Sequence, residues 1–364
     1  MSKLALTFIA VLLICMQAMP AKAYVIRSGF TDGCHEWITG NAWMDSPLPD
    51  FATADHVVVP EGDVWRQLAG LLTERLLGGV IPETQSFVLF SLIVGVRDVD
   101  TQGGSVTDLD RQRQIHADPH PRGQYVHALR APEDDEPHGT RNAVAGTRAV
   151  IDEIVAAAVE ASRKPAEEQI VSVPMTLDFY GRFDVEVWEP GFLLGHAAHA
   201  LQDSFAHTIR SADGLHEIVH VLNFVDAIYT DFRESRDGIA HSRHLDRCFS
   251  NGSVELTEAA EAASVQLFDV FLRARAGDEE APGALLDEWL SQADCDIDDP
   301  DCVDPKWVEA ARTDPSRPLL PTGLICSAHP VTERSADVSV VGLLLLGLIA
   351  ARVTRRRTCR PDEA

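Results

Sequence analysis

The chain has 364 residues, of which 45% are hydrophobic and 24% are charged, so it can bury a sizeable core and is neither a disordered tail nor a fibrous repeat. Its formal charge of -25 at pH 7 disfavours non-specific binding to a polyanion, and we expect no duplex DNA as a partner. The composition indicates a folded, acidic body, and the two ends of the chain differ from it.

The first 23 residues have the pattern of a secretory signal peptide. Lys3 precedes an apolar run over residues 4–15, and Ala21 and Ala23 are the small residues that signal peptidase requires. The apolar run is short for the roughly 30 Å hydrocarbon core of a bilayer. We therefore predict cleavage before Tyr24 and export of the body, with an uncleaved anchor as the alternative.

Between the two ends the hydrophobic spacing is mainly helical. Apolar residues recur at helical spacing over residues 64–77, and residues 84–96 are apolar on nearly every side, as in a buried helix. Further helices are predicted over residues 140–162, 191–208, 215–232 and 254–276. Strand-like alternation is rare, so the sequence predicts an all-α body with a long irregular segment at residues 98–137.

The cysteines of an exported body can form disulfides, because the compartment is oxidising. Cys295 and Cys302 bracket an acidic loop and predict a small disulfide-closed loop. Cys34 can pair with Cys248, but the spacing does not determine that pairing. The acidic loop could bind calcium through its carboxylates, although a solvated acidic turn is the interpretation we favour.

Histidine and aspartate are concentrated in one predicted helix. His196, His199 and Asp203 lie at positions i, i+3 and i+7, which share one helix face, and His207 follows one turn later. An imidazole and a carboxylate four residues apart can reach one metal ion, and zinc takes nitrogen and oxygen ligands at about 2.0–2.2 Å. We therefore predict that this segment binds metal.

The next predicted helix carries His216 and His220, again four residues apart among apolar neighbours. With Glu217 they form the pattern His-Glu-x-x-His, in which a metallopeptidase binds one zinc with both histidines and uses the glutamate as general base. Because this short pattern gives the preceding helix no role, a metallopeptidase is the minor alternative. His241 and His244, three residues apart, either support the ligands or lie on the surface.

Together these residues resemble the zinc-dependent phospholipase C and single-strand-specific nuclease superfamily. Three segments carry the resemblance, namely His35-Glu-Trp-Ile-Thr, the spacing His199-x3-Asp203-x3-His207, and Asn223-Phe-Val-Asp-Ala-Ile. The superfamily has an all-α fold with a trinuclear zinc site at the bottom of a cleft. The resemblance implies such a multi-helix bundle here.

The resemblance also implies a role for each matched residue. His199 and Asp203 are implied as zinc ligands, and Asp203 would bridge two ions. His207 and His220 are implied as ligands of a further ion, and His35 would serve a third. The chain would therefore hold two or three zinc ions.

Asp98 matches the aspartate that lies over the metal pair in this superfamily, which implies it as both a ligand and the general base, with Asp100 as its substitute. Among the histidines that follow, we choose His127 as the next ligand over His116 and His120.

The chain departs from the superfamily at two points. The predicted mature chain begins with Tyr24, where the superfamily has Trp. The superfamily's His-x3-Glu is here His216-x3-His220, so the last ligand is His216, Asp226 or missing. The implied domain covers residues 24–325, of which residues 286–325 match loosely and resemble a linker.

The C-terminal tail has an apolar run at residues 338–351 followed by a cluster of arginines, which holds that side in the cytoplasm. With Cys326 upstream, residues 326–364 resemble the sorting tails of myxobacterial surface proteins, and a plain membrane anchor is the alternative. Both predict that the body lies outside the cytoplasm and meets a membrane surface through the tail. We expect it at the cell surface or outer membrane of a Gram-negative-type bacterium.

The residues and the resemblance predict an exported zinc-dependent phosphodiesterase of the phospholipase C type. Paired zinc ions activate water and stabilise an in-line displacement at phosphorus, and Asp98 would orient or deprotonate the water. Export and the acidic charge favour a phospholipid head group as substrate. The alternatives are a single-strand nuclease of the same fold and a non-catalytic surface protein stabilised by metal.

Overall fold

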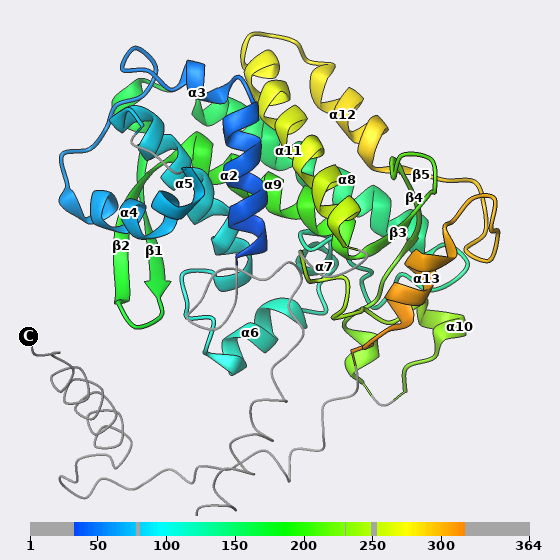
Figure 1. Cartoon of the computed structure of the whole chain (residues 1–364). Helices are drawn as coiled ribbons and strands as arrows, with labels where there is room; N and C mark the ends of the chain where they lie inside the picture. Colours follow the sequence, from blue (N-terminus) through cyan, green and yellow to red (C-terminus); the bar gives the residue numbers. More distant parts are fainter. Residues whose placement is uncertain (1–32, 78–80, 230, 249–252, 317–364) are drawn as a thin grey trace, which may run out of the picture. The chain divides into compact units, whose positions relative to one another are not determined.

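Helices form most of the protein, as the computed structural model shows for residues 33–77, 81–229, 231–248 and 253–316 (Figure 1). These residues belong to one unit that ends at Pro318. The predicted signal peptide, the start at Tyr24, Cys326 and the tail at residues 326–364 lie outside the described residues. None of the described helices combines the length and the apolar character needed to cross a bilayer.

Five predicted helices are present at nearly the predicted bounds. The helices of the described residues are α2 (Cys34–Asp45), α3 (Leu48–Phe51), α4 (Asp63–Leu77), α5 (Glu83–Thr101), α6 (Leu109–His116), α7 (Pro121–Tyr125), α8 (Gly139–Ala161), α9 (Glu189–Ala206), α10 (Glu234–Asp237), α11 (Val254–Arg275), α12 (Ala281–Trp289) and α13 (Pro305–Arg312). The predictions from hydrophobic spacing correspond to α4, α5, α8, α9 and α11. The segment at residues 98–137, expected to be irregular, contains the end of α5 and the short helices α6 and α7.

The prediction of an all-α body is wrong, because the described residues also form two small sheets. In the first sheet, β1 (Ile170–Leu177) and β2 (Gly181–Trp188) make an antiparallel hairpin. Strand β1 is rich in β-branched residues, which favour extended backbone. In the second sheet, β4 (Glu217–Val221) lies between β3 (Thr208–Arg210) and β5 (Ser291–Gln292). The fold is therefore mainly helical with a minor strand component.

The helix predicted over residues 215–232 is replaced by strand β4 and the 3-10 turn Asp226–Ile228. Leu215 enters the strand with a φ of 62°, which is outside the helical region. The strand then pairs antiparallel with β3 and parallel with β5. Pairing with segments distant in sequence has thus overridden a spacing that is also compatible with a helix.

Helices α5 and α9 pack closely in the interior, and α8 and α11 also pack against α9 (Figure 1). Two glycines make the close approach possible. A Cβ atom on Gly95 would lie 2.1 Å from the carbonyl oxygen of Phe192, and one on Gly195 would lie 2.4 Å from that of Leu92. The packing buries the middle of α9 completely, including His199 and Asp203.

Two disulfides connect segments of the described chain. The predicted bond between Cys295 and Cys302 is confirmed, and it closes the acidic loop before α13. Cys34 and Cys248 form the second bond, which the sequence left open. This bond joins the first residue of α2 to the loop before α11, although the two cysteines are 214 positions apart.

Candidate metal centre

Three groups of two histidines and one aspartate lie buried in the described part of the chain. Group 1 is His35, His199 and Asp203, group 2 is Asp100, His116 and His127, and group 3 is His207, His241 and Asp246. Within each group the possible ligand atoms lie within 4.8 Å of one another. Because buried polar groups are costly without partners, this arrangement is compatible with the binding of metal ions.

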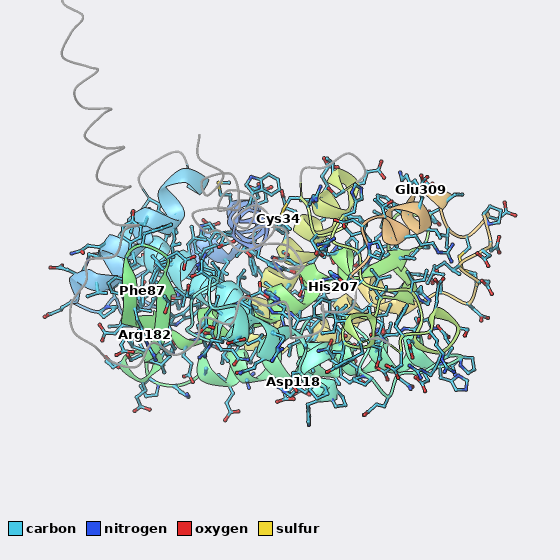
Figure 2. All side chains as sticks on the ribbon, turned by 90° about the horizontal axis from the view of Figure 1, so that it is seen from below. Cys34, Phe87, Asp118, Arg182, His207 and Glu309 are labelled. Carbon is cyan, nitrogen blue, oxygen red and sulfur yellow. A yellow bond between two sulfur atoms is a disulfide. The ribbon has the colours of Figure 1, made fainter. Side chains whose placement is uncertain are left out.

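The ligand candidates come from segments that are far apart in sequence. Helix α9 provides His199 and Asp203 one turn apart, and His207 follows directly after its last turn. The other residues are on the first turn of α2, at the ends of α5 and α6, after α7, and in the loop before α11. Figure 2 shows His207 among the side chains in the middle of the view. The packing of these elements around α9 therefore assembles the groups.

Asp203 joins groups 1 and 2 through its two oxygens. Its Oδ2 lies 2.9 Å from His199 Nε2 and 3.1 Å from His127 Nδ1. Its Oδ1 lies 3.2 Å from His35 Nε2. Ligand atoms around a tetrahedral zinc ion with bonds of about 2.0–2.1 Å are about 3.4 Å apart. The distances from Asp203 to these three imidazoles are therefore compatible with shared metal ligation by both of its oxygens.

Asp100 faces the same imidazoles from α5. Its Oδ1 lies 2.9 Å from His116 Nε2, 3.7 Å from His199 Nε2 and 3.8 Å from His127 Nδ1. Groups 1 and 2 are therefore continuous, and we call their six residues the central cluster.

Group 3 contains buried polar atoms without hydrogen bonds inside the described chain. Asp246 Oδ1 lies 3.2 Å from His241 Nε2 and 3.7 Å from His207 Nε2. Neither carboxylate oxygen of Asp246 makes a hydrogen bond to a described residue, and His207 Nε2 makes none either. A cation bound between these three side chains would satisfy these atoms.

Five of the histidines are oriented in the same way. In each, Nε2 faces a carboxylate while Nδ1 is within hydrogen-bond distance of an oxygen atom. These oxygens are Gln202 Oε1 for His35 (2.8 Å), Gln112 O for His116 (2.8 Å), Val96 O for His199 (2.9 Å), His127 O for His207 and Ser316 Oγ for His241 (3.1 Å). A hydrogen bond from Nδ1 to an oxygen favours the tautomer in which Nε2 can bind a metal ion.

The charges within the central cluster reinforce one another. Burial alone would raise the pKa of Asp203 and Asp100, but the neighbouring imidazoles, His199 first, hold both pKa values below their ordinary range. Burial would lower the pKa of His35, but the charge of Asp203 raises it to about 9. Burial lowers the pKa of His127 to about 4. The two carboxylates are therefore ionised and able to bind cations.

The structure brings together five of the side chains predicted for the site, namely His35, His127, His199, Asp203 and His207. It places Asp98 outside the three groups. Asp98 Oδ2 lies 3.3 Å from His196 Nε2, and both side chains are partly exposed. Two steps along a helix rotate a side chain by about 200°, so Asp98 and Asp100 point in different directions. Asp100 has the position that was predicted for Asp98.

His216 and His220 also lie outside the three groups. The ring of His216 packs on that of Trp289, with centroids 4.5 Å apart. His220 Nε2 accepts a hydrogen bond of 3.0 Å from the backbone N–H of Ile239. Four residues of a strand span about 13 Å, so the two imidazoles cannot chelate one ion. This geometry removes the basis for the metallopeptidase alternative.

Four members of the groups were missed or ranked too low from the sequence. Asp100 was placed behind Asp98, and His116 behind His127, yet Asp100, His116 and His127 are all in group 2. His241 was expected only to support the ligands or to lie on the surface, and Asp246 had no helical spacing that could have identified it. The Cys34–Cys248 disulfide brings their loop to α2, next to His35. Two further candidates are elsewhere: His120 caps α7, and Asp226 accepts a hydrogen bond from Asn223.

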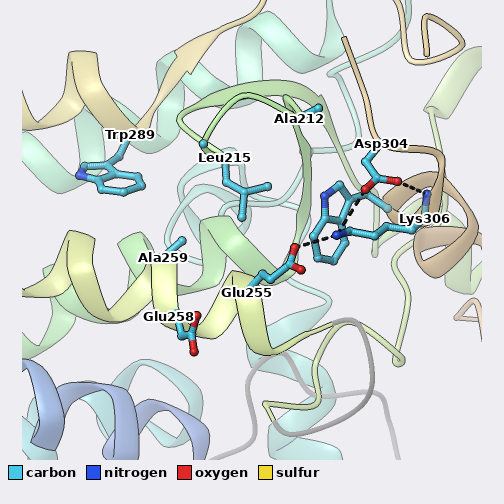
Figure 3. Close-up of a pocket in the computed structure, with 10 residues that line it drawn as sticks. Ala212, Leu215, Glu255, Glu258, Ala259, Trp289, Asp304 and Lys306 are labelled. Carbon is cyan, nitrogen blue, oxygen red and sulfur yellow. Dashed lines mark hydrogen bonds and ion pairs between the residues drawn. The ribbon is translucent and has the colours of Figure 1, made fainter. Parts of the chain in front are cut away.

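A cavity of about 400 Å³ lies apart from these groups (Figure 3). None of the residues that line it belongs to the three groups. Lys306 Nζ lies 2.7 Å from Glu255 Oε2 and 3.3 Å from Asp304 Oδ2, so two of the acidic groups there already form ion pairs within the chain. The cavity therefore does not compete with the metal centre as a candidate site.

Comparison of the chain with protein-family models, with curated proteins and with solved structures finds no match. The resemblance to the phospholipase C and nuclease superfamily accordingly stays an expectation from the sequence. The geometry of the three groups is the basis for assigning a function.

Proposed function

We propose that the protein is a zinc-dependent phosphodiesterase of the phospholipase C type. The observation that carries this proposal is the position of Asp203, whose two oxygens face different imidazoles and could therefore serve two neighbouring ions. Carboxylate-linked pairs of ions about 3.5–4 Å apart are used by phosphatases and nucleases for in-line displacement at phosphorus. A third group of the same composition, group 3, includes His207, which lies four residues after Asp203.

The donor set suits zinc. All possible ligand atoms are imidazole nitrogens and carboxylate oxygens, which zinc binds readily. A histidine that binds zinc typically donates a hydrogen bond from its other ring nitrogen to an oxygen, as Nδ1 can do here. The hydrogen-bonding capacity left at Asp246 and His207 supports an ion at group 3. The proposed ligands are those of the three groups, with Asp203 shared.

When bound, paired divalent ions polarise phosphoryl oxygens and lower the pKa of water. The chain's own residues then have three tasks. Asp203 would hold two adjacent ions through its two oxygens, and the hydrogen bonds to Nδ1 would keep the imidazoles oriented. Asp100 Oδ2 makes no hydrogen bond to a described residue, so it would be available to orient an attacking water. All nine residues of the three groups are buried, and the low dielectric constant of the interior strengthens the electrostatic interactions of their charged side chains.

We propose a phospholipid head group as substrate. The formal charge of -25 supports a small phosphodiester over a long polyanion, and the predicted export supports contact with lipid. The nuclease alternative differs only in the substrate, because a fold does not determine it.

The test combines metal analysis with turnover. The full chain, purified without chelator, should contain two or three zinc ions and hydrolyse a chromogenic phosphodiester and phosphatidylcholine vesicles. Asp203→Asn should lose both metal and activity, while His216→Gln, which changes a histidine outside the groups, should retain both. Hydrolysis of single-stranded DNA but not of lipid would support the nuclease. A zinc-loaded chain inactive on all three substrates would overturn the proposal and favour a metal-stabilised surface protein.

A further inference from the structure

The turn between β1 and β2 exposes two adjacent aromatic side chains. Asp178, Phe179 and Tyr180 form this turn, because the last pair of the two strands is Leu177 with Gly181. Phe179 is 82% exposed and Tyr180 is 61% exposed, which makes them the most exposed large apolar side chains of the described residues. The hairpin packs on α5, and its turn lies at the edge of the described unit (Figure 1). Contact with an apolar surface would remove both rings from water.

The backbone of the turn is strained at the first of these aromatic residues. Phe179 has a φ of 72°, in the left-handed region that a bulky side chain rarely adopts and that turns normally fill with glycine or asparagine. The same turn does use glycine at its other positive φ, since Gly181 has a φ of 107°. Strained residues are concentrated at functional sites. The aromatic ring at this position therefore indicates a role for Phe179 beyond the formation of the turn.

The charges of the hairpin also differ between its turn and its body. Asp178 Oδ1 accepts a hydrogen bond of 2.5 Å from Ser105 Oγ, so the carboxylate of the turn is held against the loop after α5. Arg182, the first charged residue of β2, is exposed. The next acidic residue, Asp184, follows two positions later, which is about 7 Å along a strand. In a chain with a formal charge of -25, the end of the hairpin thus presents two aromatic rings and a cation.

The hairpin is attached to a segment that carries two members of the central cluster. The hydroxyl group of Thr176 donates a hydrogen bond of 2.8 Å to the carbonyl oxygen of Gly103, in the same loop as Ser105. This loop connects the end of α5, which carries Asp100, to α6, which ends with His116. A surface that binds the turn is therefore connected to the metal centre through one short loop.

We infer that Phe179 and Tyr180 insert into the surface of a phospholipid membrane. Aromatic side chains favour the boundary between hydrocarbon and head groups, where the hydroxyl group of tyrosine stays in contact with water. Arg182 can then bind the phosphates of the head groups. The chain between Ser316 and the apolar run predicted to meet a membrane, residues 338–351, spans at most about 75 Å. The predicted tail would therefore keep the hairpin near lipid. The inference rests on the proposed function in one respect, because the lipid bound by the turn is also the proposed substrate.

The first experiment measures quenching of tryptophan fluorescence by brominated phosphatidylcholine in vesicles, with the full chain. The predicted tail would hold every variant at the vesicle, so the measurement compares positions of tryptophan and not overall binding. Brominated lipid should quench the emission that Phe179→Trp adds to that of the wild type. Tyr229→Trp changes another exposed aromatic residue, and its added emission should not be quenched. Equal quenching of the two variants, or none in Phe179→Trp, would overturn the inference.

The second experiment compares two substrates. Replacing both Phe179 and Tyr180 by Ser should lower hydrolysis of phosphatidylcholine vesicles by about tenfold, because two apolar rings no longer enter the lipid. Hydrolysis of a soluble chromogenic phosphodiester should change by less than about twofold, since neither residue belongs to the metal centre. Phe179→Gly should also lower vesicle hydrolysis, yet it should unfold at a temperature no lower than that of the wild type, because glycine relieves the strain. Equal losses on both substrates would contradict a role in lipid binding.

The proposed function and this inference can fail separately. If the chain hydrolyses no phosphodiester, quenching of Phe179→Trp alone would still support membrane binding by the turn. Turnover of lipid without such quenching would keep the phosphodiesterase and remove the membrane contact. Sedimentation velocity tests the remaining occupant of the turn: a dimer of the wild type that is lost in the double serine variant would overturn the inference in favour of a second copy of the chain.

Discussion

Helix α9 and the segment that forms strand β4 both offer a pair of possible metal ligands four residues apart among apolar neighbours, yet only the pair of α9 belongs to the metal centre. In α9 the pair is His199 and Asp203, whose Nε2 and Oδ2 atoms lie 2.9 Å apart. At β4 the pair is His216 and His220, which a strand separates by about 13 Å. Two side chains four residues apart can therefore reach the same metal ion on a helix but not along a strand.

The largest difference is expected between a variant at Asp203 in α9 and a variant at His220 in β4. Asp203→Asn removes the charge that faces His35, His127 and His199, so metal affinity and turnover should each fall by more than about 100-fold. His220→Asn should change neither by more than about threefold, since His220 contacts no member of the three groups. Equilibrium dialysis with zinc and an assay with a chromogenic phosphodiester measure both. Equal losses in the two variants would mean that β4 belongs to the site.

The loop before α11 provides His241 and Asp246 to group 3, and the disulfide between Cys34 and Cys248 attaches this loop to α2. Replacing Cys34 and Cys248 together by Ser should lower the free energy of unfolding by about 2–5 kcal/mol, because the disulfide closes a long loop. It should also lower metal binding at group 3, since Asp246 lies two residues before Cys248. The matched control, serine at Cys295 and Cys302, opens a loop with a separation of only 7 residues and should cost less. Urea unfolding and metal analysis of both double variants provide the comparison.

The close contact of α9 with α5 can be weakened by one methyl group. In Gly195→Ala the new Cβ would lie 2.4 Å from the backbone oxygen of Leu92, so we expect a loss of about 1–3 kcal/mol in stability. Gly283→Ala adds the same methyl group to α12, where nothing lies within 4 Å, and should stabilise by about 0.5–1 kcal/mol. Thermal unfolding of the metal-free proteins tests this. A stability of Gly195→Ala equal to that of the wild type would contradict the packing of α5 on α9.

His220 should affect stability through pH and not through metal. Burial first, and then the charge of Arg130, lower its pKa in the folded state from 6.5 to about 3. Below pH 6.5 the unfolded chain takes up a proton that the folded chain does not, so stability falls as the pH drops towards 3. Between pH 7 and 4.5 the wild type should lose about 2–3 kcal/mol more than His220→Asn. Denaturant unfolding with chelator present measures this difference, and parallel curves for the two proteins would refute it.

The smallest effect is expected at Asp98, which was predicted as the general base. Asp98→Asn should change metal content and turnover by less than about twofold, because its carboxylate faces His196. Asp100→Asn, two residues later on the same helix, should lower both by at least about tenfold. The ratio of the two effects locates the functional face of α5. A larger loss in Asp98→Asn would return the catalytic role to that residue.

The sequence by itself determined the local features of this protein. The helical spacing predicted α4, α5, α8, α9 and α11, and it placed His199 and Asp203 on one face of α9 with His207 one turn later. The short separation of Cys295 and Cys302 predicted their disulfide. These features follow from interactions between residues close in sequence, which periodicity records directly.

The tertiary structure decided which distant residues join them. Strand β4 formed because it could pair with β3 and β5, although its spacing also suited a helix. His241 and Asp246 carry no periodic signal, and they reach group 3 because backbone hydrogen bonds to Asn223 and Ser316 and the Cys34–Cys248 disulfide hold their loop. Contacts of this kind join segments that are far apart in the chain, so no local pattern could have predicted them.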